Sequence, residues 1–174
     1  MHRGHLPALG YVYVALGVPA LVLGPRHERA ASALMTAAGL AYLWFLGSLT
    51  AQLVRFEPDG FFASVVGLGG AAYLAIQGIA VLSGLTQLAA LSSASASTVI
   101  IGSSLAAWRA RKIRRWFAQA GIVGGIAVVV IGMVEGAANW TFMRESIFAS
   151  SLGFMFWVLV TSTYLLKRSA TRTR

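Results

Sequence analysis

Polar residues inside otherwise apolar stretches are the first candidates for chemistry in this chain. In the serine-rich segment 86–108, helical spacing would place Ser93, Ser97 and Ser104 on one face. Gln77 is a candidate neighbour of that face, and Glu135 ends another apolar stretch. These five residues could line a polar path through the molecule. Close packing of small residues is the favoured explanation of the serine face, and a structural ion pair or an exposed helix end is the favoured explanation of Glu135.

Glycines recur at helical spacing in two further apolar stretches. Where a side chain is missing at positions i and i+4, a neighbouring helix can approach closely. The first stretch contains two such GxxxG steps. The helix-packing candidates are Gly121, Gly125, Gly132 and Gly136 in the first stretch, and Gly67, Gly70 and Gly78 in the second. The partner is either another helix of the same chain or another subunit.

A dense basic run lies between Trp108 and Trp116. Its members are Arg109, Arg111, Lys112, Arg114 and Arg115. Such a cluster could hold anionic lipid head groups. The simpler interpretation is topological, because basic residues and interfacial tryptophans anchor a helix end at a membrane surface. Nucleic acid is not an expected partner, since one short loop offers no recognition scaffold.

Groups that support enzyme or metal chemistry are missing from the sequence. There is no cysteine, and His2, His5 and His27 lie outside the apolar stretches. The sequence contains no phosphate-binding Gly-Lys-Ser, no nucleophile elbow and no aspartate-rich motif. We therefore expect no catalytic residue, no metal and no cofactor, which favours a protein that is not an enzyme.

The composition indicates which elements carry these residues. Of 174 residues, 57% are apolar and 11% are charged, against roughly 25% charged in soluble domains. A membrane-spanning helix needs about 20 apolar residues. Cutting at charges and turn residues predicts an all-α, polytopic bundle of six transmembrane helices in a single transmembrane domain, 1–174. The expected spans are 6–24, 30–54, 61–83, 86–108, 116–135 and 147–166.

The distribution of charge predicts the orientation of these spans, because Lys and Arg are retained in cytoplasmic loops. With six spans and a cytoplasmic N-terminus, the basic residues on the inner side are Arg3, Arg55, Arg109, Arg111, Lys112, Arg114, Arg115, Lys167, Arg168, Arg172 and Arg174. The outer side holds Arg26, Arg29 and Arg144, together with Glu28, Glu135 and Glu145. The outer charges cancel, so the net charge of +9 falls inside. We expect a multi-pass cell-membrane protein with both termini in the cytoplasm.

Two short segments carry a family resemblance. They are Leu-Trp-Phe-Leu-Gly-Ser-Leu at 43–49 and Arg-Arg-Trp-Phe-Ala-Gln-Ala-Gly at 114–121. With the six-span layout, they resemble small uncharacterised bacterial six-helix membrane proteins, a domain-of-unknown-function family frequent in actinobacteria. In that family the fifth helix commonly begins with a Pro-Arg-Trp-type segment, and here Arg114 stands where the proline would be. The resemblance implies an architecture and no activity.

Two function classes follow from these patterns. The favoured one is a small accessory or structural subunit of a bacterial inner membrane, acting by helix packing and by contacts with lipids or a partner. Its expected partners are membrane lipids, with anionic head groups on the cytoplasmic side, and a protein or second copy docked on the glycine faces. The alternative is a transporter for a small solute or lipid, with a path lined by Ser93, Ser97, Gln77 and Glu135.

Overall fold

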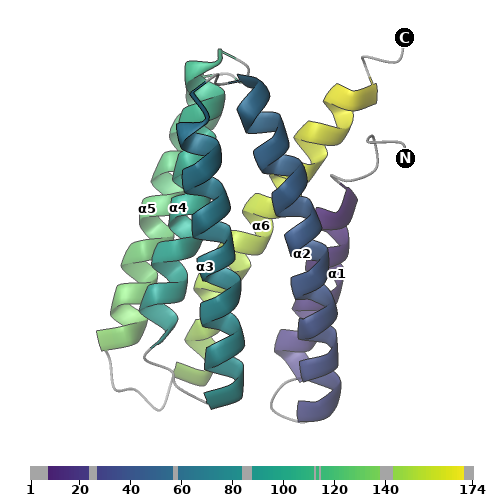
Figure 1. Cartoon of the computed structure of the whole chain (residues 1–174). Coiled ribbons are helices and arrows are strands. Elements are labelled where there is room, and N and C mark those ends of the chain that lie inside the picture. The colour runs from purple at the N-terminus through teal and green to yellow at the C-terminus, as the bar shows by residue number, and fades with distance from the viewer. Residues whose placement is uncertain are drawn as a thin grey trace. The chain divides into compact units, whose positions relative to one another are not determined.

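The computed structural model describes residues 8–23, 27–56, 59–83, 88–111, 113, 115–137 and 143–170. This part of the chain contains six helices and no strand (Figure 1). The helices are α1 (Leu9–Leu23), α2 (Glu28–Phe56), α3 (Phe61–Ser83), α4 (Leu88–Arg109), α5 (Arg115–Ala137) and α6 (Met143–Ala170). The all-α prediction is confirmed. A helix pairs its backbone groups within one segment, which suits so apolar a chain.

The helix boundaries follow the expected spans and differ mainly where charges flank an apolar stretch. The helix α3 coincides with the expected span 61–83, whereas α2 and α6 begin earlier than expected and end later. The first turns of α2 and α6 include Glu28 and Arg144. Charged residues are good helix formers, so a cut at a charge marks the end of an apolar segment and not the end of its helix.

Three of the described helices are long and apolar enough to cross a membrane. They cover Arg29–Arg55, Phe61–Ile79 and Arg115–Val134. Two further apolar helices, Leu9–Leu23 and Ser151–Tyr164, are shorter. The serine-rich α4 has 22 residues and is not among the three. Length and composition therefore indicate a membrane protein.

The chain divides into two compact units. Unit 1 comprises Met1–Leu49 and Met155–Arg174, and unit 2 comprises Thr50–Phe154. Unit 1 thus holds α1, most of α2 and the C-terminal part of α6, while unit 2 holds α3, α4 and α5 with the adjoining ends of α2 and α6. The single transmembrane domain expected over 1–174 stays a prediction.

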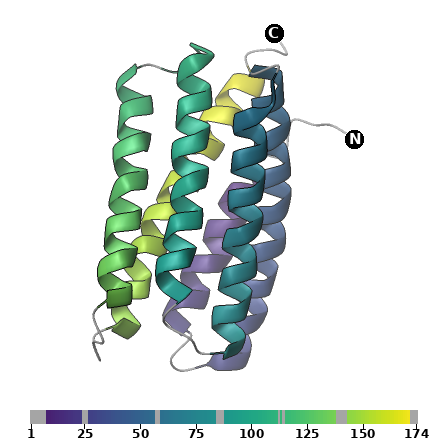
Figure 2. The same cartoon turned by 60° about the vertical axis from the view of Figure 1, so that its left-hand side comes forward.

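In unit 2, the helix α4 packs against both α3 and α5. Figure 2 shows these three helices side by side. The side chains of Val66, Val99 and Ile100 are buried, and the Tyr73 ring lies 4.6 Å from the Phe154 ring, centroid to centroid. This position gives α4 two packed faces, so its serines can meet two different neighbours.

In unit 1, aromatic rings join α1 to α2. The ring centroids of Tyr13 and Tyr42 lie 5.1 Å apart, and Phe45 follows at 6.2 Å from Tyr42. The hydroxyls of Tyr11 and Thr163 share a hydrogen bond of 2.6 Å, which ties α1 to α6. Tyrosine suits this role because its ring packs against apolar neighbours while its hydroxyl bonds to a polar one.

Candidate functional site

Two of the expected glycines bring α5 into close contact with α4. A Cβ atom added at Gly125 would lie 2.6 Å from Cγ1 of Ile101. A Cβ atom added at Gly121 would overlap the hydroxyl of Ser104 and lie 3.0 Å from its Cβ. A larger residue at either position requires a shift of the facing Ile101 or Ser104 side chain or of the helices themselves. The first GxxxG step of α5 therefore faces another helix of the same chain.

A hydrogen bond reinforces this contact. The Ser97 hydroxyl donates to the Gly125 carbonyl oxygen, with an oxygen–oxygen distance of 2.6 Å, and Ser97 is only 2% exposed. The bond forms because the absent side chain at Gly125 leaves its carbonyl open to a side chain from α4. Interhelical bonds of this kind contribute modestly, about 0.6 kcal/mol on average in membrane proteins. Steric fit and hydrogen bonding thus act on the same residue.

The opposite face of α4 meets α3 through a different set of residues. The Gln77 side-chain amide donates to the Ser92 hydroxyl over 2.8 Å. A Cβ atom added at Gly69 would lie 3.1 Å from Cγ2 of Thr98, and one at Gly102 would lie 3.0 Å from Cγ2 of Val66. Small residues on both helices therefore allow α3 and α4 to pack closely.

The other expected packing glycines differ in burial and in how closely a neighbouring residue approaches them. Gly70 and Gly132 are buried. A Cβ atom at Gly67 would make an ordinary contact of 3.5 Å with Thr50, and one at Gly78 would meet nothing within 4 Å. The surroundings of Gly136 lie outside the described residues. Helical spacing identified the glycines, but only some of them face a neighbour.

Two members of the expected polar path, Gln77 and Ser97, form hydrogen bonds on different sides of α4. Ser93, Ser97 and Ser104 are all buried, and Ser97 and Ser104 face α5. Gln77 donates a hydrogen bond to Ser92, which is not among the expected path residues. The side chain of Glu135 lies outside the described residues. Ser97 and Ser92 therefore take part in hydrogen bonds across helices, with α5 and α3 respectively.

Unit 1 contains a close contact that the sequence argument missed. A Cβ atom added at Gly10 would overlap the Ser162 hydroxyl and lie 3.0 Å from Cδ2 of Phe45. One at Gly17 would lie 2.5 Å from Cε of Met155. The signal was the spacing of Gly10 and Gly17, which places both on one face of the first span. The two glycines are two helical turns apart, so they do not match the four-residue spacing of a GxxxG step.

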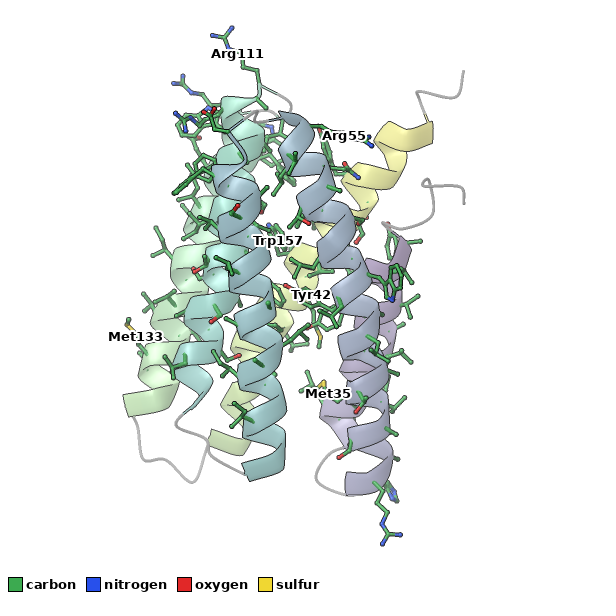
Figure 3. All side chains as sticks on the ribbon, viewed as in Figure 1. Met35, Tyr42, Arg55, Arg111, Met133 and Trp157 are labelled. Atoms are coloured by element: carbon green, nitrogen blue, oxygen red, sulfur yellow. The ribbon has the colours of Figure 1, made fainter. Side chains whose placement is uncertain are left out.

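The described members of the basic run lie where α4 ends and α5 begins. The Arg109 guanidinium lies 5.6 Å from the centre of the Phe62 ring, and the Arg115 guanidinium lies 5.9 Å from that of Trp108. Arg111 has a φ of 51°, and its backbone N–H donates to the Trp108 carbonyl over 2.9 Å. Figure 3 shows the Arg111 side chain pointing away from the helices. Lys112 and Arg114 lie outside the described residues.

The described side chains contain no group of three or more His, Asp or Glu residues that could hold a metal ion. The hydroxyls of Ser95, Thr98 and Ser103 donate to carbonyls of their own helix, whereas Ser97 and Gln77 bond across helices. The exposed arginines of the α4–α5 turn can attract anions. No protein-family model, curated protein or solved structure matches this chain.

Proposed function

We propose that this protein crosses the cell membrane six times, with both termini in the cytoplasm. The three long apolar helices and the excess of basic residues in the expected inner segments support this proposal. Large apolar side chains on the surface support it as well. Leu68 is 74% exposed, Phe156 68% and Val123 66%. Lipid tails cover such side chains at no cost, whereas their exposure to water is unfavourable.

The proposed role is that of a small accessory or structural subunit, which acts through helix packing and through contacts with lipids or a partner. The observation that supports helix packing most directly is the hydrogen bond from Ser97 to the Gly125 carbonyl, at the point where Gly121 and Gly125 face α4. Here a buried hydroxyl and two glycines serve the contact between two helices. A partner or second copy would then meet other residues, such as Gly78 on α3, which has open space beside it.

The transporter alternative has less support. It needs Ser93, Ser97, Gln77 and Glu135 to share one path, but Gln77 bonds to Ser92 on the α3 side of α4 while Ser97 bonds to α5. A hydroxyl already paired with a protein carbonyl has less capacity to bind a solute.

Native mass spectrometry of the protein extracted in its own lipid tests the proposed role. An accessory subunit should appear with a stoichiometric second protein or as a defined homo-oligomer, because its surface serves to dock a partner. The same extraction from cells that lack the chain identifies background proteins. A monomer that retains one specific small solute would contradict the subunit role and favour the transporter.

Cysteine labelling tests the six-span topology. The chain contains no cysteine, so one introduced thiol is unique. His27 and Asp59 are exposed, and they lie before the first residue and after the last residue of α2. We expect a membrane-impermeant maleimide to label His27→Cys in intact cells, and Asp59→Cys only after the cells are opened. Complete labelling of both variants in detergent is the control. Labelling of both thiols from the same side would refute the topology.

A further inference from the structure

Exposed arginines gather at one end of unit 2. Arg55 belongs to the last turn of α2, Arg109 ends α4, Arg111 lies in the turn that follows, and Arg115 begins α5. All four are exposed, and Figure 3 shows Arg55 and Arg111 at the same end of the unit. We call these four arginines the basic end. Three helices contribute to it, so it is a surface of the fold and not only a run in the sequence.

Aromatic side chains place the basic end at the level of lipid head groups. Trp108 and Trp116 are exposed on either side of the turn, and Phe61 is exposed at the start of α3. Tryptophan favours the membrane–water interface because its ring is apolar and its N–H is polar. The Arg115 guanidinium also lies over the Trp108 ring, which holds the cation near this interface.

Two of the four arginines occupy positions where the backbone favours another kind of residue. Arg111 is the one described non-glycine residue with positive φ, and helix ends of this kind strongly prefer glycine. Arg115 lies in the first turn of α5, which contains no acidic residue, although the positive end of the helix dipole disfavours a cation there. Arg55 and Arg109 lie at helix C-termini, where a cation is favoured.

A purely topological role does not account for this placement. Retention of the loop in the cytoplasm requires positive charge near the helix ends, and a neighbouring position would supply it equally well. A bound anion would offset the unfavourable helix dipole at Arg115 and the clustered positive charge to which Arg111 contributes. Guanidinium groups suit phosphate in particular, since they can donate two parallel hydrogen bonds to its oxygens.

We propose that the basic end binds the phosphate of an anionic phospholipid head group in the cytoplasmic leaflet, with Arg111 and Arg115 as its principal contacts. This deepens the proposed function by naming a lipid class, and it rests on that function because it requires this end to lie at a membrane surface. Arg55 and Arg109 add attraction from the adjoining helix ends, and Trp108 and Trp116 adjoin the glycerol region of the lipid.

The test uses the full chain in vesicles that contain phosphatidylglycerol and phosphatidylcholine in equal amounts, followed by native mass spectrometry of the retained lipids. The unmodified protein should retain phosphatidylglycerol preferentially. Arg111→Gly and Arg115→Gln should each lower this preference about fivefold, and the double variant about 25-fold, at about 1 kcal/mol per basic residue. Arg111→Gly should also be at least as stable as the parent in pure phosphatidylcholine, because glycine suits a positive φ.

Arg29→Gln is the matched control. Arg29 lies in the first turn of α2, as Arg115 does in α5, and it is also exposed. Its loss should leave the lipid preference unchanged. The proposal is overturned if Arg29→Gln lowers the preference as much as Arg115→Gln does, or if the double variant retains it. It is also overturned if inorganic phosphate alone remains bound and displaces the lipid, which would identify a free anion as the ligand.

The orientation of the double variant is checked separately, because the loss of basic residues can invert a membrane protein. In that variant, Asp59→Cys should still be labelled only after the cells are opened. If the labelling pattern of the parent protein refutes six spans, the proposed function fails whatever lipid is retained. If that pattern holds and the phosphatidylglycerol preference is absent, only the lipid inference fails.

Discussion

Gly125→Leu is expected to lower the free energy of unfolding by about 3 kcal/mol or more. A Cβ atom at this position would already lie 2.6 Å from Cγ1 of Ile101 and 3.3 Å from the Ser97 hydroxyl. The larger side chain must therefore push α5 away from α4, and overpacking of a close contact costs about 1–3 kcal/mol, sometimes more. The displacement also breaks the hydrogen bond from Ser97 to the Gly125 carbonyl. Loss of this interhelical bond adds a further cost of about 0.6 kcal/mol.

Gly124→Leu provides the matched control. Gly124 is the adjacent residue of the same helix, and a Cβ atom there would meet nothing within 4 Å. The two variants add the same side chain to the same helix, so their difference isolates the contact with α4. Unfolding by titration with a denaturing detergent measures both. Equal losses in the two variants would show that α5 does not pack on α4 as described.

Gly10→Ala is expected to lower the free energy of unfolding by about 2 kcal/mol, through unit 1. The added methyl group would overlap the Ser162 hydroxyl and lie 3.1 Å from Cγ1 of Val158. Ser162 is fully buried, so its hydroxyl has little room to turn away. The helices α1 and α6 must separate to accept the methyl group, at the usual cost of an overpacked contact.

Removal of the Ser162 hydroxyl should rescue this variant. The hydroxyl has no hydrogen-bond partner among the described residues. Ser162→Ala alone is therefore expected to be neutral or to stabilise the protein by up to about 1 kcal/mol, because it removes a buried polar group. Gly10→Ala combined with Ser162→Ala should recover most of the loss.

Thermal unfolding in one detergent measures the three variants as a double-mutant cycle, with Gly47→Ala as the control. Gly47 lies on α2 in the same unit and has open space beside it, so alanine there should cause no loss. Simple addition of the Gly10→Ala and Ser162→Ala effects would show that these two residues do not touch.

Much of the helical architecture could be predicted from the sequence, because the reasons for it are local. Apolar length predicts a helix wherever a chain must pair its own backbone groups away from water. The segment 61–83 matches α3 for this reason. The expected spans 30–54 and 147–166 are shorter than α2 and α6, because Glu28 and Arg144 flank apolar stretches but still belong to their helices.

The contacts of the candidate site were less predictable. Adjacent residues of a helix point about 100° apart, so the rotation of α4 about its own axis decides whether Ser92 or Ser93 meets Gln77. The structure brings Gln77 to Ser92. In the same way, Gly125 faces α4 while the adjacent Gly124 faces open space.

The apolar and helix-forming character of the chain, its net charge of +9 and the dense basic run between two tryptophans follow directly from the amino-acid sequence. Composition and local spacing are enough for these properties, because backbone pairing and charge are set residue by residue. The packing of α4 against both α3 and α5 and the contact of Ser162 with Gly10 become visible only in the folded chain. These features depend on the rotation and approach of whole helices, which result from the combined packing of many side chains and not from any one segment.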